Sequence, residues 1–107
     1  NNGKFFRDLI YVDDVISAIK SIMLKGQSGN LYWISSNTKT WFYELGEILE
    51  KLTDTPVVYI DPPQYTKQVD VGNFLVDNSK LCSLGWKPSI PLENGIKKTL
   101  DYFQSLK

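Results

Sequence analysis

FFRDLIYVDDV, residues 5–15, contains the transition from a predicted strand to a predicted helix. Aromatic and β-branched residues are frequent from Phe5 to Val12, a composition typical of a β-strand. Asp13 and Asp14 follow at the start of a helical pattern, where either carboxylate can act as the N-cap. Arg7 lies inside this strand, and its guanidinium needs an anionic partner there.

The rest of the chain also alternates between strand and helix patterns. The apolar residues of the first predicted helix form one face: Val12, Val15, Ile16, Ile19, Ile22 and Met23. Further helices are predicted after Thr40, over SKLCSL (79–84) and from Pro91, and short strands over NLYWIS (30–35) and VVYID (57–61). The segment 64–76 is predicted to be irregular. The fold class is therefore mixed αβ (α/β), with three short strands and four helices in a small lobe.

Length and composition indicate one globular domain over residues 1–107, with 42% hydrophobic and 13% aromatic residues. Twelve basic residues balance twelve acidic ones, which argues against nucleic acid or an anionic membrane as a partner. No apolar run reaches the roughly 20 residues of a membrane-spanning helix. The single Cys82 excludes an internal disulfide and favours a reducing compartment, so a cytoplasmic location is expected.

The residues needed for catalysis are largely missing from this sequence. It contains no histidine and one cysteine, which excludes Ser/His/Asp triads, Cys/His pairs and zinc clusters within the chain. No G-x-G-x-x-G loop is present, and no tyrosine is followed by lysine four residues later. We therefore expect no catalytic, cofactor-binding or metal-binding residue in this chain.

Binding residues are better candidates. Arg7 presents a planar fork that suits phosphate oxygens, and Lys67 and Asp70 lie in the irregular segment, where loops often carry function. The alternative for Arg7 is an ion pair with a nearby carboxylate: Asp8, Asp13 or Asp14. The alternative for Lys67 and Asp70 is solvated loop charge.

Three stretches, taken in order, resemble a known family, the extended short-chain dehydrogenases/reductases that act as nucleotide-sugar epimerases and dehydratases. FFRDLIYVDDVISAI resembles the family segment "RDfiyVdDvv.A", and GNLYWISSNTKTWFYELGEIL resembles "G.vyNigsg...s..el...i". VGNFLVDNSKLCSLGWKPSIPLENGIKKTLDYF is similar to the family's ending, "aD.SKa...LGW.P...leeGl..t..yy". The resemblance covers residues 3 to 104.

The resemblance implies that the chain is the C-terminal substrate-binding portion of a longer enzyme. The N-terminal Rossmann domain, which holds NAD and the catalytic Tyr and Lys in this family, is lacking here, and no cofactor is expected for this portion alone. Arg7 corresponds to the family's arginine at the substrate cleft. Lys67 and Asp70 correspond to positions on the diphosphate and ribose side of the substrate, although arginine is more usual at the position of Lys67.

The expected function is to hold a nucleoside diphosphate sugar for an NAD-dependent epimerase of the UDP-sugar 4-epimerase type. A nucleotide-sugar 4,6-dehydratase of the same family is the alternative. A non-catalytic nucleotide-sugar-binding module, or an interaction module without ligand, also stays open. The expected partners are the sugar nucleotide and the N-terminal Rossmann domain of the same parent chain, with self-association of the isolated chain through apolar surface.

Overall fold

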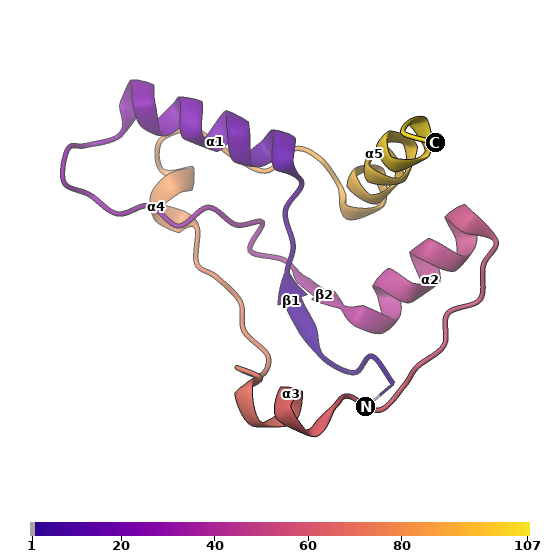
Figure 1. Cartoon of the computed structure of the whole chain (residues 1–107). Coiled ribbons are helices and arrows are strands. Elements are labelled where there is room, and N and C mark those ends of the chain that lie inside the picture. The colour runs from indigo at the N-terminus through magenta and orange to yellow at the C-terminus, as the bar shows by residue number, and fades with distance from the viewer. Residues whose placement is uncertain (1) are drawn as a thin grey trace.

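The computed structural model describes residues 2–107, and over this range the chain forms two strands and five helices (Figure 1). The elements follow one another as β1 (Phe6–Asp8), α1 (Val12–Lys25), β2 (Lys39–Trp41), α2 (Phe42–Thr53), α3 (Gln64–Val69), α4 (Ser79–Cys82) and α5 (Leu92–Ser105). The expected mixed αβ class is therefore confirmed, whereas the numbers of strands and helices differ from the prediction.

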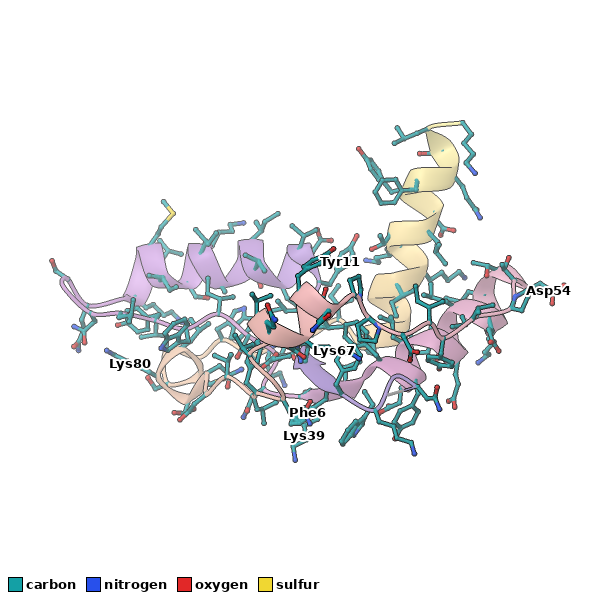
Figure 2. The ribbon with its side chains drawn as sticks, turned by 60° about the horizontal axis from the view of Figure 1, so that its bottom comes forward. Phe6, Tyr11, Lys39, Asp54, Lys67 and Lys80 are labelled. Carbon is teal, nitrogen blue, oxygen red and sulfur yellow. The ribbon has the colours of Figure 1, made fainter. Side chains whose placement is uncertain are left out.

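β1 and β2 form a two-stranded antiparallel sheet in which Phe6 pairs with Trp41 and Arg7 pairs with Thr40. The Phe6 and Trp41 rings meet edge to face, with their centroids 5.1 Å apart. Lys39 places its ammonium 5.1 Å from the centre of the Phe6 ring (Figure 2). Cross-strand contacts of this kind stabilise a sheet that has only three residues in each strand.

The buried core is small and lies between α1, α4 and the turn after α4. It consists of Ala18, Leu81 and Trp86, and the Trp86 indole N–H donates to the Ser17 hydroxyl at 2.9 Å. The side chains packed against this cluster are Ile10, Ile22, Tyr32, Ile34, Cys82 and Leu84. α1 therefore turns its Ala18 side inward.

Most of the predicted apolar face of α1 does not reach this core. Val12, Ile16, Ile19 and Met23 are all exposed, and 80% of Met23 is accessible to solvent. The structure instead buries Asp14 and Ala18 on the opposite side of the helix. Of the predicted face, Ile22 is packed against the core, whereas these four exposed side chains lie on the far side of the helix.

The chain is also more open than its size predicts. Its radius of gyration is 16.4 Å, whereas a compact domain of this length has about 13 Å. The accessible surface is 7963 Å², against roughly 6,100 Å² for a compact monomer of 12.3 kDa. The chain thus exposes roughly 1,900 Å² more surface than a compact monomer, which is more than the ~800 Å² that one partner buries in a standard protein–protein interface. Within the described range, no helix is long and apolar enough to cross a membrane.

Two carboxylates of the opening stretch hold loops together. Asp8 accepts hydrogen bonds from residues 36, 37 and 76, and Asp14 accepts from Ser89 and Ile90. The expected N-cap role of Asp13 or Asp14 is wrong, because α1 begins at Val12 and has no side-chain cap. Asp14 is only 2% exposed, and its carboxylate instead accepts hydrogen bonds from backbone N–H groups in the segment that leads into α5.

Several predicted elements differ from the observed ones. The predicted strands over 30–35 and 57–61 are extended but unpaired, and the predicted strand over Phe5–Val12 shortens to Phe6–Asp8. β2 was not predicted, and α3 occupies part of the segment expected to be irregular. A strand needs a partner, and the described chain offers one only to residues 6–8 and 39–41.

Candidate functional site

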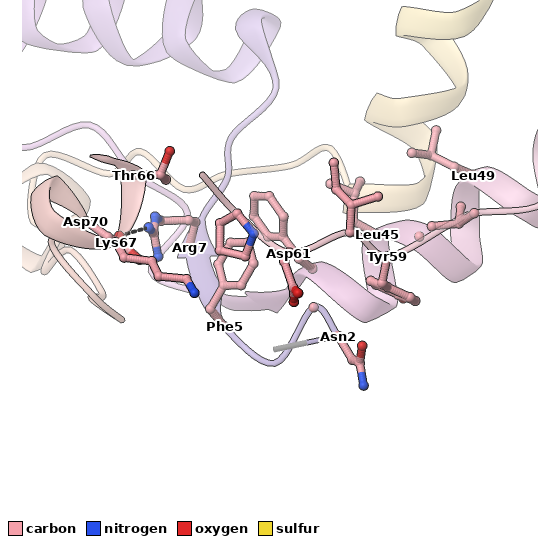
Figure 3. Close-up of a pocket in the computed structure, with 16 residues that line it drawn as sticks. Asn2, Phe5, Arg7, Leu45, Leu49, Tyr59, Asp61, Thr66, Lys67 and Asp70 are labelled. Carbon is pink, nitrogen blue, oxygen red and sulfur yellow. Dashed lines mark hydrogen bonds and ion pairs between the residues drawn. The ribbon is translucent and has the colours of Figure 1, made fainter. Parts of the chain in front are cut away.

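A cavity of about 710 Å³ lies between β1, α2, the extended segment that follows α2, and α3 (Figure 3). Arg7, Lys67 and Asp70, the three candidate residues of the sequence analysis, all line it. Arg7 lies in β1, whereas Lys67 and Asp70 lie in α3 and at its C-terminal end, more than 50 residues further along the chain. The fold therefore brings the predicted binding residues to one cavity.

Arg7 has an elaborate set of contacts. Its Nη2 donates to Asp70 Oδ1 at 2.7 Å, and its Nη1 donates to the carbonyl oxygens of Phe6 at 3.0 Å and Gly72 at 2.9 Å. The guanidinium carbon lies 5.3 Å from the centre of the Phe5 ring and 5.4 Å from that of Phe74. With its side chain 21% exposed, Arg7 is held in place and fastens the 70–74 segment to β1.

The neighbouring carboxylates do not pair with Arg7. Within the described residues the only ion-pair partner of Arg7 is Asp70, 63 positions away. Asp8 and Asp14 are both engaged by backbone N–H groups of other loops, as described above. The local alternative of an ion pair with Asp8, Asp13 or Asp14 is therefore wrong.

Asp70 and Lys67 keep capacity for a ligand. Asp70 uses Oδ1 for both Arg7 and the backbone N–H of Gly72, while its Oδ2 accepts no hydrogen bond from the described residues. Lys67 is exposed in the last turn of α3, and its ammonium forms no ion pair within residues 2–107. Figure 3 shows its side chain on the same side of the cavity as Arg7 and Asp70.

Several residues of the cavity were not predicted. Its apolar wall comes mainly from the aromatic pair Phe5 and Phe42, whose ring centroids are 4.1 Å apart, together with Leu45 and Tyr59. Asp61 adds a second carboxylate opposite Lys67 (Figure 3). For Tyr59 and Asp61 the prolines that follow the VVYID run were the available signal, since they indicate an extended segment.

Gly46 allows this wall to close against α2. A Cβ at Gly46 would lie 3.2 Å from the Tyr59 hydroxyl oxygen and 3.4 Å from Val57 Cγ1. The glycine therefore lets the extended segment after α2 approach the helix closely enough to complete the cavity.

The cavity suits binding rather than bond-making chemistry. It combines two cations, two carboxylates and an aromatic wall, but it has no imidazole or thiol. Among the described residues there is no cluster of His, Cys, Asp and Glu that could hold a metal ion. A second cavity of about 700 Å³ between the segment 9–11, α2 and α5 is mostly aliphatic and contains none of the three candidate residues.

Known proteins with similar sequences are nucleotide-sugar enzymes. No family model matches the chain. A dTDP-D-glucose 4,6-dehydratase of Mus musculus is 29% identical over 107 residues, covering 92% of this chain and 29% of the mouse protein. A dTDP-glucose 4,6-dehydratase of Xanthomonas campestris is 28% identical over 116 residues, covering 95% of this chain and 32% of the bacterial protein.

Solved structures agree with the sequence matches. A UDP-glucose 4-epimerase of Thermotoga maritima, solved with UDP-glucose, has a TM-score of 0.84 and 33% identity, covering 99% of this chain and 34% of that structure. A dTDP-glucose 4,6-dehydratase of Bacillus anthracis in complex with NAD has a TM-score of 0.75 and covers 98% of this chain and 33% of that one, but at 22% identity it bears on the fold alone.

The chain thus spans about a third of the length of these mouse, Xanthomonas and Thermotoga proteins. The matched sequences and the matched folds carry names from the same group of enzymes. Over nearly its whole length, the chain is similar to a C-terminal portion of the extended short-chain dehydrogenases/reductases, the nucleotide-sugar epimerases and dehydratases.

Proposed function

We propose that this chain is the substrate-binding portion of a longer NAD-dependent nucleotide-sugar epimerase, of the UDP-sugar 4-epimerase type. The observation that carries the proposal is the 33% identical fold match to an epimerase solved with UDP-glucose, at a TM-score of 0.84. The cavity lined by Arg7, Lys67 and Asp70 supports it independently, since its volume of about 710 Å³ lies in the range of small-molecule sites.

Each of the three residues has a role in this proposal. Lys67 supplies an ammonium that meets the diphosphate as a point charge, and Arg7 adds the N–H groups that its contacts with Asp70 and Gly72 leave over. Asp70 Oδ2 accepts from the ribose hydroxyls. The aromatic wall of Phe5 and Phe42 excludes water from one side of the ligand. The site would thus hold and orient the nucleotide while the sugar extends toward the reacting centre.

The chain's own residues do not fit the cofactor. NAD is held in Rossmann domains by a Gly-rich loop at a helix N-terminus, and no G-x-G-x-x-G occurs in this sequence. When bound elsewhere in the parent protein, NAD would supply the hydride transfer. The contribution of residues 1–107, as a single domain of that parent, is binding and orientation, and their surplus of accessible surface is consistent with a further domain against them.

The test is to assay the full-length protein that carries this chain with UDP-glucose and with dTDP-glucose. The proposal expects conversion of UDP-glucose to its C4 epimer, with weaker nucleotide binding in Lys67→Gln. Lys87→Gln is the matched control, because Lys87 is an exposed lysine outside the cavity. The absence of NAD-dependent turnover on either sugar nucleotide contradicts the enzymatic proposal.

A 4,6-dehydratase is the second candidate, favoured by the 29% and 28% identical dehydratases of mouse and Xanthomonas. The same assay separates the two reactions, since a dehydratase releases water and forms a 4-keto-6-deoxy sugar. Binding of sugar nucleotide without turnover would instead support a non-catalytic binding module. Failure to bind any nucleotide would leave an interaction module.

A further inference from the structure

The 70–74 segment follows α3 and lies at the surface of the molecule. Val71 is 76% exposed and Phe74 is 42% exposed. Residues 71–74 form no backbone–backbone hydrogen bond with any residue that the structure describes. Gly72 has a φ of +77° and open space where a Cβ would lie, so no close packing holds this bend. The position of the segment therefore depends on a few hydrogen bonds that involve side chains.

Three hydrogen bonds join this segment to β1. Two of them begin on the Arg7 guanidinium, which donates to Asp70 (Figure 3) and to the carbonyl oxygen of Gly72. The third begins on the main chain, where the Phe6 N–H donates to Asn73 Oδ1 at 3.0 Å. Within the described residues, Asn73 is thus the one side chain of the segment that bonds directly to the backbone of β1.

The Arg7 bonds and the Asn73 bond respond differently to a bound anion. Three N–H groups of Arg7 already serve protein oxygens, and a diphosphate competes with those oxygens for the guanidinium. The diphosphate also repels the Asp70 carboxylate, because both are negatively charged. The bond between Phe6 and Asn73 involves neither charged partner, so a ligand held by Arg7 leaves it in place.

We propose that Asn73 is a positioning residue of the nucleotide site. Its bond to the Phe6 N–H holds the 70–74 segment on β1, so that Asp70 Oδ2 stays in place to accept from the ribose hydroxyls of a nucleoside diphosphate. Asn73 does not line the cavity, and its effect on the ligand therefore passes through Asp70. This inference rests on the proposed function, because it concerns the same site.

The test is the affinity of the full-length protein for UDP and dTDP, measured by isothermal titration calorimetry. For whichever nucleotide the unsubstituted protein binds, we expect Asn73→Ala to weaken binding about 3- to 10-fold, the value of one hydrogen bond at an exposed site. Asn94→Ala is the matched control, because Asn94 is an exposed asparagine of α5 that does not line the cavity. Its affinity should stay within about twofold of the unsubstituted protein.

A double-mutant cycle with Asp70→Ala separates the positioning of Asp70 from a general effect on the fold. If Asn73 acts through Asp70, Asn73→Ala should weaken nucleotide binding by less than about twofold in the Asp70→Ala background. An equal loss in both backgrounds overturns the inference.

Turnover of the sugar nucleotide gives a further readout that a loss of stability alone would not move. Because Asn73 acts on binding of the nucleotide, the KM of Asn73→Ala should rise about as much as its Kd, while kcat stays within about twofold. A lower kcat with an unchanged KM contradicts a role in binding.

The failure of this inference differs from the failure of the proposed function. If the unsubstituted protein binds UDP or dTDP and Asn73→Ala binds the same nucleotide equally well, only the role of Asn73 is overturned. If the unsubstituted protein binds neither nucleotide, the proposed function is removed, and the role of Asn73 with it.

Discussion

Replacing Asp8 with asparagine tests how the end of β1 fixes the loops behind the candidate site. Asp8 Oδ1 accepts from the Ser36 N–H at 2.9 Å and the Ser36 hydroxyl at 2.7 Å. Its Oδ2 accepts from the backbone N–H groups of Asn37 and Val76, each at 3.1 Å. The carboxylate therefore joins three segments that are distant in sequence, and each of its oxygens serves two donors.

The expected loss of stability in Asp8→Asn follows from the two donors that each carboxylate oxygen serves. Asparagine keeps one oxygen, so in either orientation of its amide two donors keep an acceptor and two face an NH₂ group. Losing two charge-assisted hydrogen bonds and leaving donors partly buried should lower the free energy of unfolding by about 2–4 kcal/mol. Asp13→Asn is the matched control, because Asp13 is exposed and its side chain accepts no hydrogen bond within the described residues; its effect should stay within about 0.5 kcal/mol.

Urea unfolding followed by tryptophan fluorescence measures the free energy of unfolding of both variants and of the unsubstituted protein. An equal m-value with a lower midpoint for Asp8→Asn would support the estimate, since the change then lies in stability rather than in the unfolded state. A stability of Asp8→Asn within about 0.5 kcal/mol of Asp13→Asn would refute the proposed role of the Asp8 carboxylate.

Three further predictions concern other parts of the fold. Trp86→Phe removes the hydrogen bond to Ser17 and part of a buried side chain, so urea unfolding should show a loss of about 1–3 kcal/mol. Gly85 has a φ of +92°, so Gly85→Ala should cost about 1–2 kcal/mol; an unchanged unfolding midpoint would contradict this strain. Hydrogen bonds from Ser79 lower the pKa of Asp77 below the ordinary value of 3.8, so its carboxylate stabilises the fold above that pH and ceases to do so as pH falls through the folded pKa. Asp77→Asn should therefore be less stable than the parent at about pH 7 and similar to it at about pH 2, and an equal difference at both pH values would argue against this assignment.

The helices were the predictable part of the fold. Apolar periodicity located α1, α2 and α5 to within a few residues, because the pattern of a helix is contained in its own segment. It did not establish which side of α1 is buried: the stripe with Ile16 and Met23 is exposed, and Ala18 faces the core. Which side of α1 is buried depends on its packing against Leu81 and Trp86, which lie far along the chain.

Strand pairing was less predictable for the same reason. NLYWIS and VVYID have strand composition, yet neither pairs within the described chain, whereas the unremarkable segment Lys39–Trp41 pairs with β1. Hydrogen bonds between strands depend on which segments meet in space, and composition carries no record of that. α3 was missed because Gln64–Val69 lacks an apolar stripe and follows two prolines.

The candidate site was predictable in its residues but not in their contacts. Side-chain chemistry and position, together with resemblance to a family, predicted Arg7, Lys67 and Asp70 as binding residues, and the fold places all three at one cavity. The ion pair between Arg7 and Asp70 was not predicted, because the carboxylates nearest to Arg7 in sequence were the alternative partners considered. Asp8 and Asp14 are instead held by backbone N–H groups that only the tertiary fold brings to them.

The most direct test of the account is a titration of the full-length protein with UDP and dTDP, followed by amide and side-chain NMR shifts. The account predicts saturable shifts centred on Arg7, Lys67 and Asp70, with a preference for one base. Saturable shifts confined to other residues, or no saturable shift with either nucleotide, would contradict the claim that this lobe holds the nucleoside diphosphate.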